Sequence, residues 1–473
     1  MVVTERSKFV ALTGILAISE VLYVELLRFD ARSHIGRLTV ITFMLFGLYA
    51  AAVAIIRKSD TRRALKLIVA GAVLFRLTVI PVGLPTDASL TERLAMMRDD
   101  IVGSREHFRP NLLLDDDVWR YLWDGRIAAR AGNPYFAAPA GRELDRFAQA
   151  PMWRVIRSNV NHPELPTIYP PVAQVIFLVS YVLAPGSIVM LKIVLMAIDF
   201  AGIAFLFGCL RRTKRPGDVI LYAWNPLVIL MLVASAHPDG IAVTLLTLTV
   251  FLLLANRTRW SGMTLGLAAL AKLSPLVLVP LFIRRTGRAG TLALFTTLVL
   301  GSLPLFLLRG GGLQSFGEFA KNWDFNSAAF QLVRGALTPF VDDPGRLARI
   351  ILGVLVAGIA LAIAGCSDRR AESFASSAAA TLGALLVLSP TVMPWYATWP
   401  LALAVIAGNQ MIWIVFSALV CFSLPMTADW QTHTAWLWPE FGLLVLAGAM
   451  TFRSWSAPSD SEGSSGTSTA ERT

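Results

Sequence analysis

The chain has 473 residues, of which 55% are hydrophobic and 15% are charged. Soluble proteins are about 45–50% apolar and about 25% charged, so this composition excludes an ordinary soluble enzyme. The formal net charge is +11, but the basic residues gather in short clusters between apolar runs, which is the positive-inside pattern of membrane proteins and does not indicate nucleic-acid binding. Cys209, Cys366 and Cys421 are too few and too scattered for a disulfide framework or a metal site. We therefore predict an all-α polytopic membrane protein.

Apolar runs long enough to cross a hydrocarbon core of roughly 30 Å begin near the N-terminus. The first run contains Glu20 and Glu25 and lacks a small-residue cleavage signature, so it predicts a retained helix and not a signal peptide. We expect about 12 transmembrane helices, at 9–27, 38–56, 64–85, 187–210, 218–236, 238–255, 290–308, 347–365, 373–390, 394–408, 411–427 and 434–452.

Two further apolar segments are interrupted or short. If the arginine clusters at 257–259 and 284–288 are cytoplasmic, segment 260–283 must leave that side and return. Lys272 and two prolines interrupt it, so we expect a hairpin of two short half-helices. Segment 171–184 has the length of a re-entrant or interfacial piece.

Placing the basic clusters in the cytoplasm leaves two long polar loops on the other side. The first loop carries 12 Asp and Glu against 11 Arg and no Lys, unlike the basic inside loops. The tail is rich in Ser, Thr and Gly, which predicts disorder. We expect six regions: three transmembrane helices at 1–85, the first non-cytoplasmic loop at 86–170, a central membrane region at 171–308, the second loop at 309–346, a C-terminal membrane region at 347–453 and a disordered cytoplasmic tail at 454–473.

The first loop holds an acidic motif, DDDVWR, formed by Asp115, Asp116, Asp117 and the residues that follow. Adjacent carboxylates repel one another, which raises the pKa of at least one of them unless a cation lies nearby. Arg120, one helical turn on, is a candidate partner. A carboxylate held in this way is suited to act as general base for a sugar hydroxyl or to bind a divalent cation. The equally favoured alternative is an aspartate-rich helix start.

The residues after the acidic motif predict an amphipathic helix at 116–130. Trp119, Tyr121, Trp123 and Ile127 would give it an aromatic face suited to the membrane interface. The sequence Gly-Asn-Pro-Tyr at 132–135 ends it. An interfacial helix that carries acids suits a lipid-linked substrate.

A second polar stretch, NVNHPELPTIYPPVAQ, precedes an apolar segment and contains His162, Tyr169 and Gln174. Irregular backbone at membrane depth lines a cavity or is buried in protein, so this stretch is a candidate wall of a site. The alternative, favoured for the stretch in isolation, is a proline-rich connector whose tyrosine is an interface anchor.

Several charged or titratable residues lie within apolar segments or at their edges, where charges are costly and indicate function. For Arg76 and Asp199 we prefer a structural ion pair. For His237, Asp239 and Lys272 we favour a functional role, because the predicted topology places the His-Pro-Asp turn on the same side as the acidic motif. The alternative is that Asp239 caps the helix that follows it.

Taken together, DDDVWRYLWDGRIAARAGNPY, TIYPPVAQ, NPLVILMLVASAHPDG, GLAALAKLSPLVLVP, WDFNSAAF and SPTVMPWYATWP resemble a known group. The chain resembles the GT-C membrane glycosyltransferases that use polyprenyl-phosphate sugars, most closely their bacterial mannosyltransferase branch. The order of acidic motif, Gly-x-Pro-Tyr and Tyr-x-Pro is similar to that in the catalytic subunit of the first GPI mannosyltransferase. The resemblance spans about residues 60–450.

The resemblance implies a GT-C-type helical bundle in the plasma membrane and inverting transfer on the non-cytoplasmic face. A hexose, favoured as mannose, would pass from a polyprenyl-phosphate sugar to a glycolipid or glycan acceptor. The family's base falls on Asp116 or Asp117, and three consecutive aspartates leave that register open. Asp115 and Asp117 also form an Asp-x-Asp, which leaves open whether Mg²⁺ or Mn²⁺ assists the transfer.

Other residues are assigned to the substrates on the same basis. Lys272, Arg120 and His237 are candidate ligands of the leaving phosphate. Trp395 and Tyr396 are suited to stack on a sugar or prenyl unit, or else are interface aromatics. Asn326 is a candidate on the acceptor side. We also expect substrate contacts from Asp115, Tyr121, Asp124, Asn133, Tyr135, His162, Tyr169, Gln174 and Asp239.

A multi-span transporter or flippase of a polar or lipid-linked substrate is the alternative function, because broken helices and intramembrane charges are typical of carriers. The chain shows no obvious internal repeat, and a long polar loop follows only three spans, which argues against a carrier. A third possibility is a non-catalytic membrane scaffold or a polymerase or ligase of surface glycans. These share their architecture with the glycosyltransferases, so the sequence separates them poorly.

Overall fold

The computed structural model of the protein describes residues 5–56, 61–103, 116–307, 312–368, 370–408, 411–425 and 441–442. Within these ranges the chain is helical, and they contain no β-strand beyond two isolated bridges, Val82–Leu84 and Phe325–Thr391. The predicted all-α class is thus confirmed. Asp115, nearly all of the span expected at 434–452 and the whole tail lie outside the described residues.

The described residues contain nineteen α-helices. The first ten are α1 Glu5–Glu25, α2 Ile35–Ile56, α3 Thr61–Val79, α4 Leu90–Val102, α5 Asp117–Ala131, α6 Pro151–Ser158, α7 Pro171–Leu183, α8 Ile188–Arg212, α9 Ile220–Ala223 and α10 Pro226–Val228. The others are α11 Asp239–Leu254, α12 Thr258–Ala271, α13 Val279–Leu307, α14 Gly312–Asn322, α15 Ala328–Leu337, α16 Pro344–Cys366, α17 Ala371–Leu388, α18 Thr398–Ala407 and α19 Met411–Leu419.

Five helical stretches in the described ranges are long and apolar enough to cross a membrane. A sixth arises if the pair Pro216–Ala223 and Pro226–Ala234, bent by 50° at Trp224 and Asn225, counts as one broken span. The five stretches are Glu5–Arg28, Ile35–Ile56, Ile188–Arg212, Ser274–Phe306 and Pro344–Cys366. The fourth is broken at Gly287, so only its second part, from about residue 290, would be the crossing. The protein is therefore a helical membrane protein.

The expected span at 64–85 differs from what the structure shows. Its helix, α3, ends at Val79 and is not among the apolar stretches, because four basic residues, Arg62, Arg63, Lys66 and Arg76, interrupt it. The apolar helices near 171–183, 239–254, 373–388 and 411–423 are also shorter than a full span.

The hairpin expected between Arg259 and Arg284 is present. Gly262 of α12 faces Gly290, Gly266 faces Thr297, and Leu270 faces Gly301, so residues 290–301 run parallel to α12. Residues 274–286, which connect these two segments in the chain, therefore run in the opposite direction. The chain reverses again at Gly287, where φ is 62° and ψ is −168°. Lys272 follows directly after α12 and lies at the tip of this hairpin.

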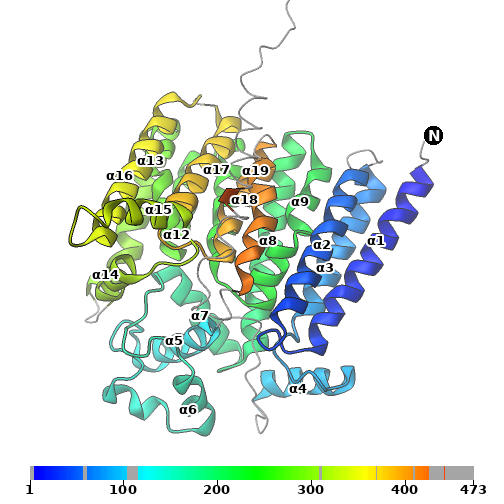
Figure 1. Ribbon diagram of the computed structural model, residues 1–473, viewed down its shortest axis with the longest axis horizontal. Coiled ribbons are helices and arrows are strands. Elements are labelled where there is room, and N and C mark those ends of the chain that lie inside the picture. Colours follow the sequence, from blue (N-terminus) through cyan, green and yellow to red (C-terminus); the bar gives the residue numbers. More distant parts are fainter. Residues whose placement is uncertain are drawn as a thin grey trace, which may run out of the picture.

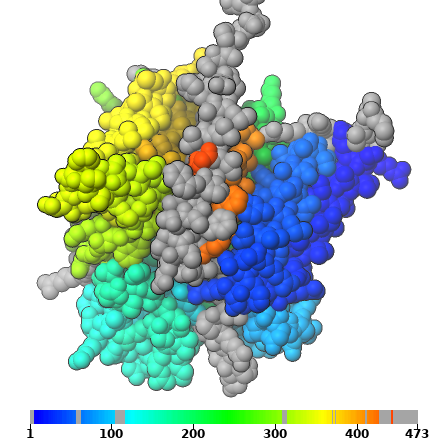
Figure 2. All heavy atoms as spheres, in the orientation of Figure 1, coloured from blue at the N-terminus to red at the C-terminus, as the bar shows by residue number. Residues whose placement is uncertain are grey.

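Helices α4, α5 and α6 gather at one end of the bundle, and α1 begins at the opposite end (Figure 1). In the space-filling view, the chain from α5 through α6 forms a mass at the lower edge, and α4 lies apart from it below α1 and α2 (Figure 2). This arrangement agrees with the prediction that the first long loop and the N-terminus lie on opposite sides of the membrane.

Helix α5 is the helix predicted at 116–130, and it ends at Gly132, whose φ of 74° suits glycine. Its aromatic residues do not face the membrane surface: Trp119, Tyr121 and Trp123 are each only 1% exposed. Gly125 lets the backbone of Phe177 in α7 approach so closely that a Cβ would lie 2.5 Å from its carbonyl oxygen. The prediction that these aromatic side chains face the membrane interface is therefore wrong, because they pack against protein.

Arg76 and Asp199 form the structural ion pair that we predicted. The Arg76 Nε donates to Asp199 Oδ2 at 2.6 Å, and the Tyr222 hydroxyl donates to Asp199 Oδ1 at 2.9 Å. A second Arg76 nitrogen donates to the carbonyl of Ala223 at 2.7 Å. This fully buried cluster joins α3 and α8 to the broken helix α9–α10.

Candidate functional site

The candidate site is a cavity of about 500 Å³ at the end of the bundle where α5 lies. It is bounded by the start of α5, by the stretch 161–170, by the hairpin tip at Lys272, by α14 and by the turn that leads into α18. Its polar lining comes from Arg32, Asp116, Asp117, Arg120, Tyr121, Asn161, His162, Tyr169, Asp239, Lys272, Ser274, Ser315, Ser389, Thr391 and Tyr396. Most of the residues predicted for the site therefore meet in one space.

Asp117 is the carboxylate most fully held within this cavity. Asn161 Nδ2 donates to its Oδ1 at 2.6 Å. The hydroxyls of Tyr169 and Tyr121 donate to its Oδ2 at 3.3 Å and 3.4 Å. Burial raises the pKa of Tyr169 well above its ordinary value, and the nearby negative charge of Asp117 adds to the effect. Tyr169 thus stays a neutral hydrogen-bond donor to the carboxylate.

Asp116 has a different partner. Its Oδ1 accepts from Arg32 Nη2 at 2.6 Å, and both side chains are nearly half exposed. Arg32 lies between α1 and α2, which places that connection at the cavity. Asp116 and Asp117 therefore engage different partners, although they are neighbours in the chain.

The expectation that Arg120 pairs with the acidic motif needs correction. Its two terminal nitrogens donate to backbone carbonyl oxygens: to Asn161 and His162 at 2.7 Å and to Leu165 at 2.9 Å. Arg120 is almost fully buried and holds the polar stretch against α5. That stretch has few backbone partners of its own, because its prolines lack an N–H.

At the hairpin tip, Lys272 and Asp239 form an ion pair surrounded by aromatic rings. Lys272 Nζ lies 3.3 Å from Asp239 Oδ1. Trp399 Nε1 donates to the same carboxylate oxygen at 2.7 Å. The ammonium also lies 4.7 Å from the centre of the Tyr396 ring, which stacks on Trp399 at 4.2 Å. Asp239 therefore engages side chains across the site, and no cap bond from it to its own helix is present among the described contacts.

His237 lies behind this lining. Its ring stacks on Trp395, with ring centres 3.6 Å apart and planes 19° apart, and it is 1% exposed. Trp395 lines the cavity, so His237 supports that ring from the back. A direct contact between His237 and a leaving phosphate, which we considered from the sequence, does not fit this position.

A buried polar layer lies about two turns further along α5 than Asp117, around Asp124. Gln174 Nε2 donates to Asp124 Oδ2 at 3.0 Å and to the Thr167 hydroxyl at 2.9 Å. Burial raises the pKa of Asp124 to about 6, and Arg120, Thr167 and Gln174 lower it only partly. Asp124 and Gln174 do not line the cavity, so their expected contact with substrate becomes a supporting role.

Three other predicted residues also support the site from outside. Asn133 Oδ1 accepts from the Tyr135 N–H at 2.9 Å in the turn after α5. The Tyr135 hydroxyl donates to the Tyr169 carbonyl at 2.9 Å. Asn326 is buried and donates to the Val392 carbonyl at 3.4 Å beside the Phe325–Thr391 bridge. These positions differ from the substrate contacts expected of them.

Several residues that line the cavity were not predicted from the sequence. Arg32 and Trp399 carry no local signal, since one lies in a short connection and the other in an apolar run. Asn161 is the neighbour of the predicted residue His162 in the polar stretch, so its position could have indicated it. Trp323, whose ring lies 4.5 Å from that of His162, closes the cavity from the α14 side.

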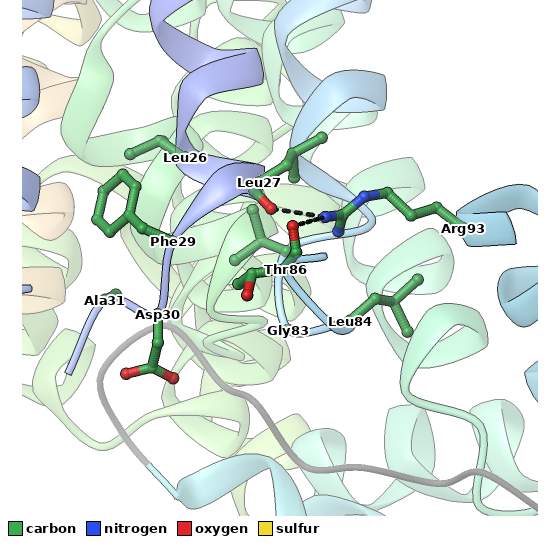
Figure 3. A pocket seen from close by; sticks show the side chains of 10 residues that line it. Leu26, Leu27, Phe29, Asp30, Ala31, Gly83, Leu84, Thr86 and Arg93 are labelled. Carbon is green, nitrogen blue, oxygen red and sulfur yellow. Dashed lines mark hydrogen bonds between the residues drawn. The ribbon is translucent and has the colours of Figure 1, made fainter. Parts of the chain in front are cut away.

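A second hollow, of about 20 Å³, lies between the end of α1 and the start of α4 (Figure 3). Arg93 donates there to the carbonyls of Leu27 at 2.7 Å and Thr86 at 3.0 Å. The hollow has room for about one water molecule and none for a sugar. In the described ranges, no group of three or more His, Cys, Asp or Glu side chains is placed to hold a metal ion.

Comparison with known proteins points to the same chemistry. Residues 112–286 match the model of a family described as alpha-(1->6)-mannopyranosyltransferase, N-terminal domain. The chain is also 27% identical, over 301 residues, to a Mycobacterium tuberculosis protein named polyprenol-phosphate-mannose-dependent alpha-(1-2)-phosphatidylinositol mannoside mannosyltransferase. That alignment covers 60% of this chain and 63% of the relative. The predicted resemblance to membrane mannosyltransferases is confirmed by both comparisons.

Proposed function

We propose that this protein is a multi-pass glycosyltransferase of the plasma membrane that transfers mannose from a polyprenyl-phosphate sugar to a glycolipid or glycan acceptor. The observation that carries the proposal is the position of Asp117. This carboxylate faces a cavity large enough for a sugar, has hydrogen-bond donors on both oxygens and lies in the segment that matches the mannosyltransferase family.

In the proposed reaction, Asp117 is the general base. It accepts the proton of the acceptor hydroxyl while that oxygen attacks the anomeric carbon. The bond between the anomeric carbon and the donor phosphate oxygen breaks, so the sugar is transferred with inversion and polyprenyl phosphate leaves. Asp116 is less suited to the role, because its carboxylate is paired with Arg32.

Lys272 is the proposed ligand of the leaving phosphate. Its counter-charge in this structure is the carboxylate of Asp239. Because Trp399 also holds Asp239, the carboxylate remains hydrogen-bonded when Lys272 turns to an incoming phosphate. Trp395 and Tyr396 line the cavity beside Lys272 and offer ring faces to the sugar.

The membrane arrangement of this proposal has about 12 crossings. Besides the five longer stretches, the crossings would be α3, the broken pair α9–α10, the shorter apolar helices α11, α17, α18 and α19 and the apolar segment at 434–452, and the hairpin of α12 would enter the bilayer without crossing it. The cavity would then face the non-cytoplasmic side, because α5 lies at the end of the bundle opposite to the start of α1, whose N-terminus is proposed to be cytoplasmic (Figure 1). No nucleic acid is part of this proposal.

The acceptor probe comes from the relative, whose name specifies a phosphatidylinositol mannoside. Purified protein in lipid nanodiscs is mixed with polyprenyl-phosphate mannose labelled in the sugar and with phosphatidylinositol dimannoside. We expect labelled mannose in the glycolipid and an equal amount of polyprenyl phosphate. A transporter or flippase would move the labelled donor across proteoliposomes and release no polyprenyl phosphate, which would contradict the proposal.

A further inference from the structure

Arg120 carries the further inference, which rests on the proposed role of Asp117 as base. The two residues are one turn apart on α5, so they project from the same side of the helix. Asp117 faces Asn161 through its carboxylate, and Arg120 faces the backbone of the same residue through its guanidinium. Asn161 is thus held by both side chains at once.

The polar stretch from 159 to 166 depends on such a hold. His162 has a φ of 46°, in the left-handed region that is costly for a residue with a Cβ. Its carbonyl accepts from both Arg120 and the Leu165 N–H, at 2.7 Å and 3.1 Å. Strained backbone of this kind persists where the surrounding structure fixes it.

An arginine suits this task better than a lysine. The planar guanidinium reaches the carbonyls of Asn161 and Leu165 with different nitrogens, whereas a lysine has a single nitrogen at its end. Both N–H groups on Arg120 Nη2 are directed to carbonyls. An incoming phosphate would have to displace a carbonyl to use that nitrogen.

We propose that Arg120 is a positioning residue for the base: its guanidinium fixes the backbone of residues 161–165 and thereby aims the Asn161 amide at Asp117. Arg120 makes no direct contact with substrate in this proposal. Loss of the guanidinium would let Asn161 move away, and the carboxylate would lose the hydrogen bond of 2.6 Å from the Asn161 amide.

The charged and titratable groups around Asp117 are Asp116 with Arg32 beside it, Tyr121 on its own helix, Tyr169, His162 and, across the cavity, Lys272 with Asp239 and Tyr396. None of them changes identity when Arg120 is replaced by lysine, and the positive charge at the position is kept. A change in the pH dependence of transfer therefore reports on the geometry around Asp117.

The matched control is Arg157, another arginine that holds the same extramembrane segment. It donates to the carbonyls of Pro139 at 2.6 Å and Gly141 at 2.9 Å and to the Asp145 carboxylate at 2.7 Å. Arg157 does not line the cavity. Arg157→Lys thus removes a comparable clamp without touching Asn161.

The test compares Arg120→Lys, Arg157→Lys, Asn161→Ala and the double variant Arg120→Lys/Asn161→Ala in full-length protein. For Arg120→Lys we expect kcat to fall about tenfold or more, as for loss of a charge-assisted hydrogen bond, with donor KM changed less than about twofold. The acid limb of the kcat profile should move to higher pH, because a carboxylate that loses a donor becomes more basic. The double variant should be no slower than Asn161→Ala.

Hydrogen exchange gives a readout independent of activity. Arg120→Lys should speed amide exchange in residues 159–168, and Arg157→Lys should speed it in 139–145 and leave 159–168 and the pH profile as in the wild type. A raised donor KM with unchanged exchange would overturn the proposal in favour of a phosphate ligand. The proposal would also be overturned if Arg120→Lys and Arg157→Lys lowered kcat equally, if the loss in Arg120→Lys added to that in Asn161→Ala, and if the pH profile did not shift. Arg120 would then contribute only to the general stability of the fold. If the wild type transfers no sugar, the proposed function fails, and exchange alone decides whether Arg120 holds the stretch.

Discussion

Lys272 lies 3.3 Å from Asp239, a carboxylate 33 positions earlier in the chain, and each is the other's counter-charge at the edge of the cavity. Asp239 is 1% exposed, so the pair is also a requirement of the fold. Removal of one partner would leave a buried charge without compensation. The structural and functional roles of Lys272 must therefore be separated by experiment.

We expect Lys272→Met/Asp239→Asn to be folded and to bind the donor weakly. Lys272→Met alone leaves a buried carboxylate, so its thermal stability should fall, and the second substitution should restore it. Donor affinity should fall about tenfold or more in both variants, because a charged hydrogen bond of roughly 1.5–3 kcal/mol is lost. Binding of labelled polyprenyl-phosphate mannose measures it, and wild-type affinity in the double variant would remove Lys272 from the site.

Asp117→Asn should abolish transfer, whereas Asp116→Asn should retain part of it. The general base contributes about 10²–10⁴-fold in rate, and Asp117 is the carboxylate with donors aimed at both oxygens. Asp116 only loses a half-exposed pair with Arg32. Initial rates of the two variants at equal protein amounts check this, and full activity of Asp117→Asn would exclude it as the base.

Asp124 should make the protein less stable as pH rises from about 4 to 6. Its pKa is about 6 in the folded protein, against an ordinary value of 3.8, so folding favours the protonated form. Stability from this group is complete below pH 3.8 and is lost as pH rises to the folded value, by on the order of 3 kcal/mol. Thermal unfolding from pH 4 to 7 should show a smaller decline for Asp124→Asn than for the wild type. Identical slopes would contradict the assignment.

The predicted topology can be tested by cysteine labelling. Cys366 is exposed while Cys209 and Cys421 are buried, so Cys366→Ser gives a quiet background. In it, Gln149→Cys should react with a membrane-impermeant maleimide added to whole cells, and Lys214→Cys should react only after permeabilisation. The opposite pattern would place the cavity in the cytoplasm.

The residues that meet in the cavity could be predicted where the membrane makes polarity costly. Asp239 and Lys272 interrupt apolar segments, and the alternation of basic clusters places both on the side of the acidic motif. Gly132 likewise predicted the end of α5, because a glycine after a helix suits a positive φ. In these cases a local rule is sufficient.

Other features depend on packing that no local pattern contains. Arg32 meets Asp116 across 84 positions, and nothing in its own connection indicates that contact. The aromatic face of α5 has the same pattern whether it meets lipid or protein, so its burial against α7 could not be read from spacing. The motif around Asn326 suggested a residue of the site. In the structure, Asn326 lies beside the Phe325–Thr391 bridge and donates to the Val392 carbonyl, so it helps to hold the turn before Trp395.

The pairing of Arg76 with Asp199 also affects the order in which the chain can enter the membrane during synthesis. The two residues are 123 positions apart, so ribosomes that add about 5–20 residues per second need about 6–25 s between them. During that interval α3 holds an arginine that costs about 2.5–3.5 kcal/mol at the centre of a bilayer, together with three further basic residues. Unlike α1 and α2, this helix is therefore not expected to be stably inserted when it leaves the ribosome. Its final insertion waits for α8, which is synthesised while more than half of the chain is still to be made, so the helices of this part of the protein do not settle in the membrane in chain order.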